Sequence, residues 1–225
     1  MMFNEGIGET VHFPTVDEDG YRTVGLYGPL TDKKAAEIVF SMRGLRHTGE
    51  VKKYNLSEEQ EAAAEKAEKE GDLTFTIPET EIATEIIFEP FEFLISTPGG
   101  IATEMLAIYD VMRDIRESME ICTLGIGKVM SAGVPLLAAG TKGKRRIGKN
   151  CRVMIHSVFA GAVGSMHEIE TEVEEIKFMQ QQYVNILVAE SDMTEKQVLD
   201  LLKTRTNCYL SAQKAVDYGI ADIII

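Results

Sequence analysis

From residue 91 to the end of the chain, apolar residues follow two different spacings. Short apolar runs such as FEFLIS (91–96) are typical of buried strands, whereas residues 101–116 repeat apolar residues every three or four positions, as amphipathic helices do. Strands and helices alternate, which predicts an α/β fold with right-handed crossovers and a mostly parallel sheet. Further strands are expected at 120–126, 152–156 and 221–225, and further helices at about 130–140, at 166–190, after Thr194 and at 211–219.

The first part of the chain predicts one more strand and helix. RTVGLY (22–27) has strand composition, and Thr31 is a helix-capping residue that precedes an apolar stripe over residues 32–43. Residues 1–20 are polar and contain glycine, which favours a flexible N-terminal arm. We therefore expect one domain over residues 21–225.

Residues 48–89 form a strongly charged insertion between these two parts. Its centre, SEEQEAAAEKAEKEG, predicts a helix, because Ser57 and Gln60 make a capping box and Gly71 suits the position after the last turn. The apolar residues of this helix are nearly all alanine, so it has little to bury, and we expect a surface insertion. A short pair of strands is expected at about 73–77 and 84–88.

The size and the charge of the chain disfavour some classes of function. A chain of 225 residues with 44% hydrophobic residues suits one α/β domain with a small appendage. The net charge of −13 disfavours nucleic acid as a partner, because nucleic acid binds through lysine and arginine. The longest apolar runs, such as residues 134–139, are far shorter than the ~20 residues that span a bilayer, and the first residues lack a signal-peptide pattern. We expect a cytoplasmic protein that binds neither membranes nor nucleic acid.

The cysteines and histidines do not predict a metal site. Three cysteines are an odd number without metal-like spacing, which favours a reduced, cytoplasmic chain. No two histidines lie at the spacing of a metal-binding pair. These residues are Cys122, Cys151 and Cys208, and His12, His47, His156 and His167.

Two segments contain candidate catalytic residues. GKVMSAG (127–133) places Ser131 where a strand ends and a helix begins, with small neighbours that let a substrate carbonyl approach and backbone N–H groups that favour an oxyanion. His156 ends the strand 152–156, at the edge where α/β folds present functional side chains. Taken alone, a serine of this kind is more often a helix-packing residue, and such a histidine is more often part of the core.

Longer motifs resemble one family. STPGG, AIYDVM, AAGTKGKRR, NCRVMIH and YLSAQKAVDYGIAD, with the segment around Ser131, follow the order found in ClpP, the proteolytic subunit of the Clp protease, and TVGLYGPLTDKKAAEIV is similar to the first strand and helix of that family. The resemblance covers about four-fifths of the chain. It implies a ClpP/crotonase-like fold of repeated ββα-type units in a spiral, with a mostly parallel sheet and a protruding handle helix at about 166–190.

The resemblance also implies roles for individual residues. Ser131 matches the nucleophile and His156 the general base of a serine peptidase, and Gly100 and Ala132 match the two backbone N–H donors of the oxyanion hole. The position of the third catalytic residue, aspartate in the family, is Asn207, and Thr206 stands where an arginine commonly links opposite rings.

Asparagine at position 207 changes the expected activity. Its carbonyl oxygen can accept the Nδ1–H bond of His156 but provides no negative charge, so we expect a slow or conditional peptidase. Asp200 is an alternative carboxylate, although its place within a predicted helix is more typical of a solvated face. The charged insertion is also foreign to the family pattern.

Partners follow from the resemblance as well. The family forms stacked heptameric rings that degrade unfolded polypeptides delivered by an AAA+ unfoldase such as ClpX, ClpA or ClpC. This chain lacks a GxxxxGK[ST] phosphate loop, so we expect no cofactor here and ATP use by the unfoldase. The handle carries an apolar stripe, which either ring contact or packing within the chain explains: Ile169, Val173, Ile176, Met179, Tyr183 and Ile186.

Two other functions fit parts of the sequence. A catalytically weak structural or regulatory subunit, in mixed rings with other ClpP-like subunits, fits Thr206 and Asn207 but is opposed by Ser131 and His156. An acyl-CoA enzyme of the crotonase type would share the oxyanion-hole architecture. The segments around the serine and the histidine match the peptidase far better.

Overall fold

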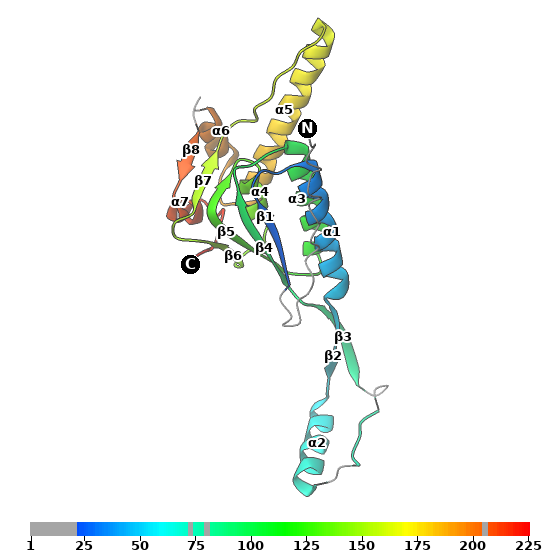
Figure 1. Ribbon diagram of the computed structural model, residues 1–225. Helices are drawn as coiled ribbons and strands as arrows, with labels where there is room; N and C mark the ends of the chain where they lie inside the picture. Colours follow the sequence, from blue (N-terminus) through cyan, green and yellow to red (C-terminus); the bar gives the residue numbers. More distant parts are fainter. Residues whose placement is uncertain (1–21, 72–73, 79–81, 204–206) are drawn as a thin grey trace, which may run out of the picture.

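The structure, a computed structural model, describes residues 22–71, 74–78, 82–203 and 207–225 (Figure 1). The expected N-terminal arm (1–20) and Thr206 lie outside the described residues. The elements, in chain order, are β1 (Thr23–Tyr27), α1 (Asp32–Thr48), β2 (Glu50–Asn55), α2 (Glu58–Glu70), β3 (Ala83–Phe88), β4 (Phe91–Thr97), α3 (Ala102–Arg116), β5 (Ile121–Met130), α4 (Gly133–Ala138), β6 (Arg145–Ile147), β7 (Arg152–Ile155), α5 (Met166–Glu190), α6 (Glu195–Lys203), β8 (Cys208–Leu210), α7 (Ala212–Asp217) and β9 (Ile223–Ile224).

The main sheet is mostly parallel. Its strands lie in the order β1-β4-β5-β6-β9, all parallel to their neighbours, and β7 is parallel to the second half of β5. Only the pairing of β8 with β7 is antiparallel among these strands of the described chain. Helices α1, α3 and α5 lie on one side of the sheet (Figure 1). The predicted α/β fold with a mostly parallel sheet is confirmed.

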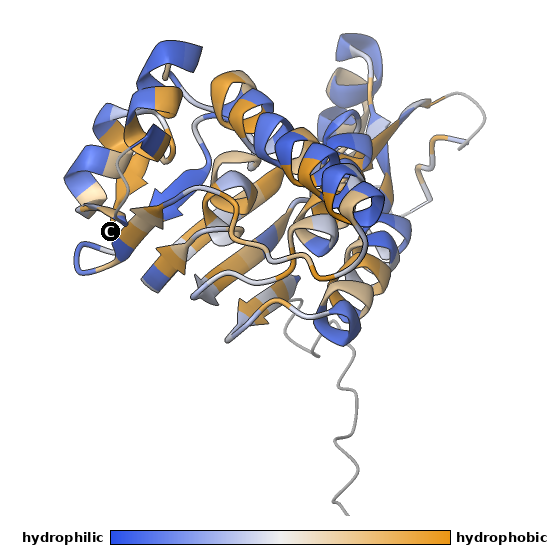
Figure 2. Cartoon of the chain, turned by 90° about the horizontal axis from the view of Figure 1, so that it is seen from above, coloured by the Kyte–Doolittle hydropathy of each residue, from blue (hydrophilic) through white to orange (hydrophobic). Residues whose placement is uncertain are grey.

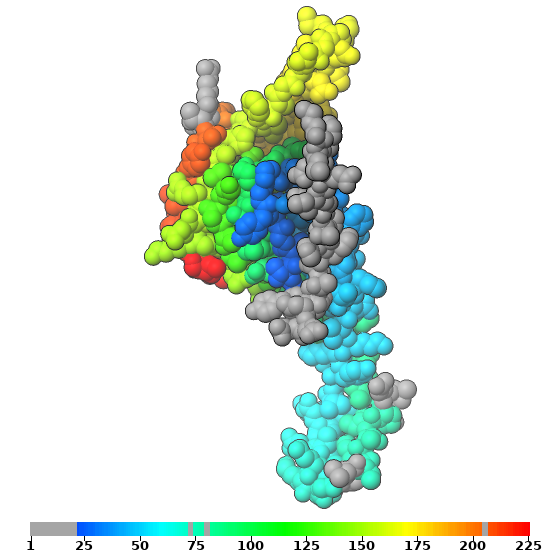
Figure 3. All heavy atoms as spheres, in the orientation of Figure 1, coloured from blue at the N-terminus to red at the C-terminus, as the bar shows by residue number. Residues whose placement is uncertain are grey.

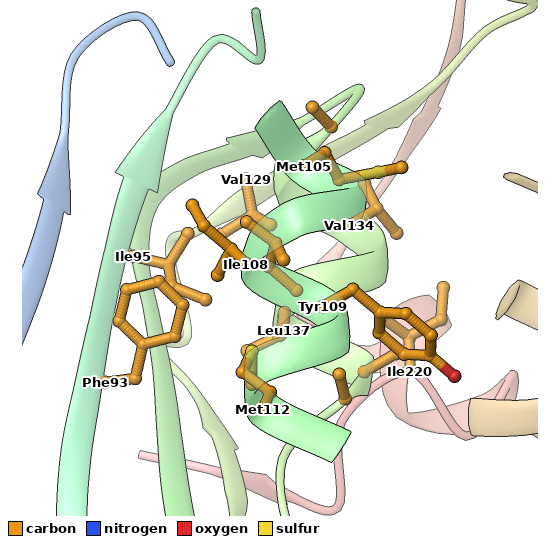
Figure 4. Close-up of a cluster of buried hydrophobic side chains, with 14 of the residues drawn as sticks. Phe93, Ile95, Met105, Ile108, Tyr109, Met112, Val129, Val134, Leu137 and Ile220 are labelled. Carbon is orange, nitrogen blue, oxygen red and sulfur yellow. The ribbon is translucent and has the colours of Figure 1, made fainter. Parts of the chain in front are cut away.

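The core lies between the sheet and these helices. β4 alternates buried and half-buried residues, and its buried side chains Phe93 and Ile95 point toward Ile108 and Met112 of α3 (Figure 4). Seen from above, apolar residues follow the strands and one side of each covering helix (Figure 2). This packing fixes the end of β4, which leads to Gly100, and the end of β5, which leads to Ser131.

Three boundaries differ from the sequence prediction. α1 continues to Thr48, because Leu45 extends the buried stripe of this helix by one more turn. β5 continues to Met130, which pairs with Met154 of β7, so the following helix α4 begins only at Gly133. The short strands β6 and β8 were not predicted, since three residues are too few to establish a periodicity.

The charged insertion forms a ribbon of two strands with a helix at its end, and it extends away from the rest of the molecule (Figures 1 and 3). The predicted helix is confirmed as α2, with both bonds of the capping box at Ser57 and a left-handed Gly71. The predicted strand at 84–88 is also confirmed, but its partner is β2 (Glu50–Asn55) and not residues 73–77. Neither strand has a buried face, so burial periodicity gave no signal for the pairing.

The handle helix α5 is buried along its second half only. Tyr183 and Ile186 pack into the core, so packing within the chain accounts for the apolar residues in this half of the helix. Ile169 and Val173, nearer its start, are 36% and 40% exposed, and Figure 1 shows this half projecting beyond the sheet. The first half of the stripe is therefore unexplained by intrachain packing.

A buried ion pair fixes the end of α5 to α3. The Glu190 carboxylate accepts hydrogen bonds of 2.8 Å from Nη1 and Nη2 of Arg116 and one of 2.9 Å from the Tyr109 hydroxyl. Burial raises the pKa of Glu190, but the bonds from Arg116 and Tyr109 and the nearby positive charges outweigh it, so this pKa lies below its usual value. The carboxylate therefore remains charged although it is almost fully buried.

Replacing Glu190 with glutamine is expected to lower the free energy of unfolding by about 3 kcal/mol, because it leaves Arg116 without its charged partner. The folded-state pKa lies below the unfolded value of about 4.3, so the Glu190 contribution is present above that pH and is lost as the pH falls through the folded-state pKa. Urea unfolding at equal protomer concentration should therefore show a difference at pH 7 that narrows in acid. Glu65→Gln, which removes an exposed ion pair with Lys69, is the control and should have no measurable effect. An equal loss in both variants would contradict the assignment.

Candidate active site

Ser131 and His156 line the same cavity, which has a volume of about 610 Å³. Ser131 follows β5, and His156 follows β7, which is parallel to β5 with Met130 opposite Met154. The two side chains therefore leave neighbouring strands at the same edge of the sheet. Both are partly buried and accessible from the cavity. The structure thus brings together the two residues that the sequence singled out.

Ser131 has an unusual backbone conformation. Its φ angle is 52°, the only positive value among the described non-glycine residues. Its N–H donates a hydrogen bond of 2.8 Å to the carbonyl oxygen of Met154, and its own carbonyl oxygen accepts one of 3.0 Å from Val134 N–H. A serine held in a strained turn between a strand and a helix is the arrangement that presents the nucleophile in α/β-hydrolases.

Tyr183 supports this turn from α5. Its buried hydroxyl donates a hydrogen bond of 3.3 Å to the carbonyl oxygen of Ser131. Burial raises the pKa of Tyr183, so the hydroxyl keeps its proton and acts as the donor. This contact could not be predicted from the sequence, because a tyrosine within an apolar stripe is typical of a core residue.

Two glycines lie against the serine. Gly99 has a φ angle of 99°, and a Cβ atom there would lie 2.6 Å from Cβ of Ser131, so only glycine fits. Gly100 and Ala132 both line the cavity. Among the backbone hydrogen bonds of the described residues, none uses the N–H of Gly100 or of Ala132 as its donor. Both amides are therefore available to a ligand oxygen.

Asn207 lies beside His156 along the strand ladder but does not bond to it. Ile155 of β7 is opposite Cys208 of β8 in an antiparallel pair, so His156 and Asn207 occupy the next position. The Asn207 side chain is exposed, and no hydrogen bond joins it to His156 within the described part of the chain. Asp200 is exposed on α6 and pairs with Lys203 at 3.6 Å, as a residue of a solvated helix face does.

No hydrogen bond joins the Ser131 and His156 side chains either, among those that the described residues form. Such bonds are often long or absent before substrate binds, and they tighten in the complex. The structure shows three features of this site: the shared cavity, the strained backbone of Ser131 and two amides without a backbone acceptor among the described residues. Together they match the requirements of acyl transfer to a serine.

The rest of the cavity wall is mostly apolar, and Thr103 adds a hydroxyl to it. The wall is formed by the segment around Gly100, by α3, by the segment after His156 and by α5. Its residues are Pro98, Ile101, Ala102, Thr103, Met105, Leu106, Val158, Phe159, Ala160, Met179 and Tyr183.

Within the described ranges, no three His, Cys, Asp or Glu side chains come together as metal ligands would. In the same part of the chain, no helix combines the length and the apolar character that crossing a bilayer requires.

A family model described as Clp protease matches residues 83–225. The match begins at β3 and continues to the last residue, so it includes the segments of Gly100, Ser131, His156 and Asn207. It covers more than half of the chain and does not include β1, α1, β2 or α2, so the resemblance of the first strand and helix to the family stays a prediction. The fold, the cavity and this match agree, and the protein belongs to the Clp protease family, whose members are ClpP-type peptidases.

Proposed function

We propose that the protein is a serine endopeptidase subunit of a self-compartmentalising Clp-type protease, which degrades unfolded polypeptides. The observation that carries this proposal is the one cavity that Ser131, His156, Gly100 and Ala132 all line, in which no backbone hydrogen bond between described residues uses the Gly100 or Ala132 N–H. The family match supports the same activity.

Each of the four residues has its own role in peptide hydrolysis. The Ser131 hydroxyl attacks the scissile carbonyl while His156 accepts its proton, and the Gly100 and Ala132 N–H groups donate to the oxyanion that forms. His156 then gives the proton to the leaving amine, and water, activated by the same imidazole, releases the acyl group from Ser131. Asn207 orients the imidazole through its carbonyl oxygen once substrate orders the site.

The assembly is part of the proposal. Stacked heptameric rings, or mixed rings with other ClpP-like subunits, enclose the sites, and the exposed apolar residues Ile169, Val173 and Phe178 of α5 give opposite rings a surface to contact. An AAA+ unfoldase such as ClpX, ClpA or ClpC delivers the polypeptide and uses ATP, in the cytoplasm. The protease subunit itself needs no cofactor.

A second function is favoured by one observation. Asn207 lacks a negative charge and its side chain is exposed rather than bonded to His156, which suits a weakly catalytic subunit that regulates or completes a ring. The two proposals differ in turnover and share the fold.

The apolar cavity wall predicts the cleavage preference. Peptides with leucine or methionine before the scissile bond should be cleaved at least ~10-fold faster than peptides with aspartate there, because Ile101, Met105 and Met179 offer no partner to a buried charge. The measurement is kcat/KM on matched fluorogenic peptides. The same exchange four residues from the scissile bond is the control and should change the rate little. Equal rates for leucine and aspartate at the first position would rule out this cavity as the substrate site.

One experiment tests the proposed function directly. The native mass of the full-length protein is measured before and after reaction with a fluorophosphonate probe. We expect a mass of ring size that increases by one probe per subunit, attached at Ser131. If the protein neither reacts with the probe nor hydrolyses a peptide reporter, the peptidase proposal is wrong and the regulatory function remains. A labelled monomer would contradict the ring assembly.

A further inference from the structure

We propose that Thr97 is a positioning residue that sets the direction of the Gly100 N–H in the oxyanion hole and thereby the rate of the chemical step. This inference rests on the proposed function. Thr97 is the last residue of β4 and is fully buried, and it does not line the cavity. It would act on the reaction only through the backbone that it holds.

The Thr97 hydroxyl joins two loops. It donates a hydrogen bond of 2.7 Å to the carbonyl oxygen of Gly28, in the turn after β1, and accepts one of 3.0 Å from the N–H of Gly99. Gly99 is the residue that packs directly against Ser131. A single buried oxygen therefore connects the β1 turn to the glycine loop beside the nucleophile.

The same two loops also meet through their backbones. Leu30 N–H donates to the carbonyl oxygen of Gly99 at 2.9 Å, and Ile101 N–H donates to the carbonyl oxygen of Leu30 at 3.1 Å. Gly100 lies between these two bonds, and a Cβ atom on it would be 2.0 Å from the Leu30 oxygen. The direction of the Gly100 N–H is thus set by the two backbone bonds to Leu30 and by the bond between the Thr97 hydroxyl and Gly99 N–H.

The Thr97 methyl group contacts the second half of the oxyanion hole. A Cβ atom on Gly133 would lie 2.5 Å from Cγ2 of Thr97, so this methyl group lies against the first residue of α4, next to Ala132. Threonine provides a hydroxyl for one donor loop and a methyl group for the other. Valine would keep the shape and lose the hydroxyl, whereas serine would do the reverse.

Loss of the hydroxyl should affect the transition state more than the bound substrate. The negative charge on the substrate oxygen develops only during attack, so a displaced Gly100 N–H weakens a bond that is made fully in the transition state. Such a change lowers kcat and leaves KM nearly unchanged. A general loss of packing would lower stability without lowering kcat selectively over KM.

The experiment compares three variants of the full-length protein. Thr97→Val is expected to lower kcat by about 10- to 100-fold with KM within about twofold, and Thr97→Ser is expected to stay within about threefold of the wild type. The control is Thr123→Val. Thr123 is equally buried, and its hydroxyl donates a 2.8 Å bond to the carbonyl oxygen of Leu137, away from the cavity. This variant should lose stability and keep its kcat.

A second measurement separates positioning from packing. A peptide boronate forms a tetrahedral adduct with Ser131 that places an oxygen in the oxyanion hole, whereas a product peptide does not. Thr97→Val should weaken boronate binding by about the same factor as kcat and leave binding of the product peptide unchanged. If Thr97→Val does not fold, Thr97→Cys replaces it, compared with Thr97→Ser, because a thiol forms only weak hydrogen bonds.

The outcomes are distinct. Wild-type kcat in Thr97→Val, equal losses in the serine and valine variants, or equal weakening of the boronate and the product peptide would each overturn the inference. A wild-type protein that neither hydrolyses the reporter nor reacts with the fluorophosphonate would instead count against the proposed function. The inference stands if only the variants that lack the Thr97 hydroxyl lose kcat and boronate affinity together.

Discussion

Replacing Ser131 with alanine should abolish peptide hydrolysis and remove fluorophosphonate labelling. The hydroxyl is the proposed nucleophile, and loss of a nucleophilic serine lowers kcat by about 10⁶-fold in subtilisin, a well-studied serine protease. The oxyanion-hole amides and the cavity remain, so substrate should still bind. The measurement is kcat on a fluorogenic peptide, together with mass spectrometry of the probe-treated protein.

Ser96→Ala is the matched control for this change. Ser96 lies in β4 near the site but does not line the cavity, and its loss should leave both labelling and turnover close to wild type. Labelling that persists in Ser131→Ala would show that another residue reacts with the probe. Such a result would remove Ser131 from the mechanism.

Replacing Asn207 with aspartate should raise kcat on a small peptide by about 100-fold. The ladder of β7 and β8 places position 207 next to His156, and a carboxylate there would stabilise the imidazolium that forms during attack. The opposite change in a trypsin-like enzyme costs about 10⁴-fold, and part of that factor should be recovered here because the side chain is exposed rather than already bonded. The measurement is kcat across pH 6–9, with native mass as a test of assembly.

Asp200→Asn is the control for this prediction. Asp200 lies on the exposed face of α6 and pairs with Lys203, so its charge should be dispensable. A severe loss in Asp200→Asn would instead make Asp200 the carboxylate of the site. An unchanged kcat in a folded Asn207→Asp protein would contradict the role of position 207 and favour the regulatory function.

Much of the fold followed from sequence periodicity. β4 and α3 were predicted within a residue or two, because buried positions alternate in one and recur every three or four residues in the other. The capping box at Ser57 located the start of α2 in a segment without a buried face. Local side-chain chemistry was sufficient for these elements.

Contacts between distant segments were harder to predict. The pairing of β2 with β3 depends on two exposed strands, and the position of Asn207 depends on the short strand β8. Thr97 gave no signal at all, since its role depends on where Gly28 and Gly99 meet in space. Ser131 and His156 were identified because motifs resembled a family, and the cavity that joins them became visible only in three dimensions.

The pairing of Glu50 with Phe88 brings the two ends of the charged insertion together at its base. Residues opposite each other in an antiparallel ladder have Cα atoms about 5 Å apart, so the two ends of the insertion meet. A tight turn of a few residues could bridge that gap and connect α1 directly to β4, and loop length costs little free energy. Replacing residues 50–88 with such a turn is therefore expected to leave the parallel sheet intact.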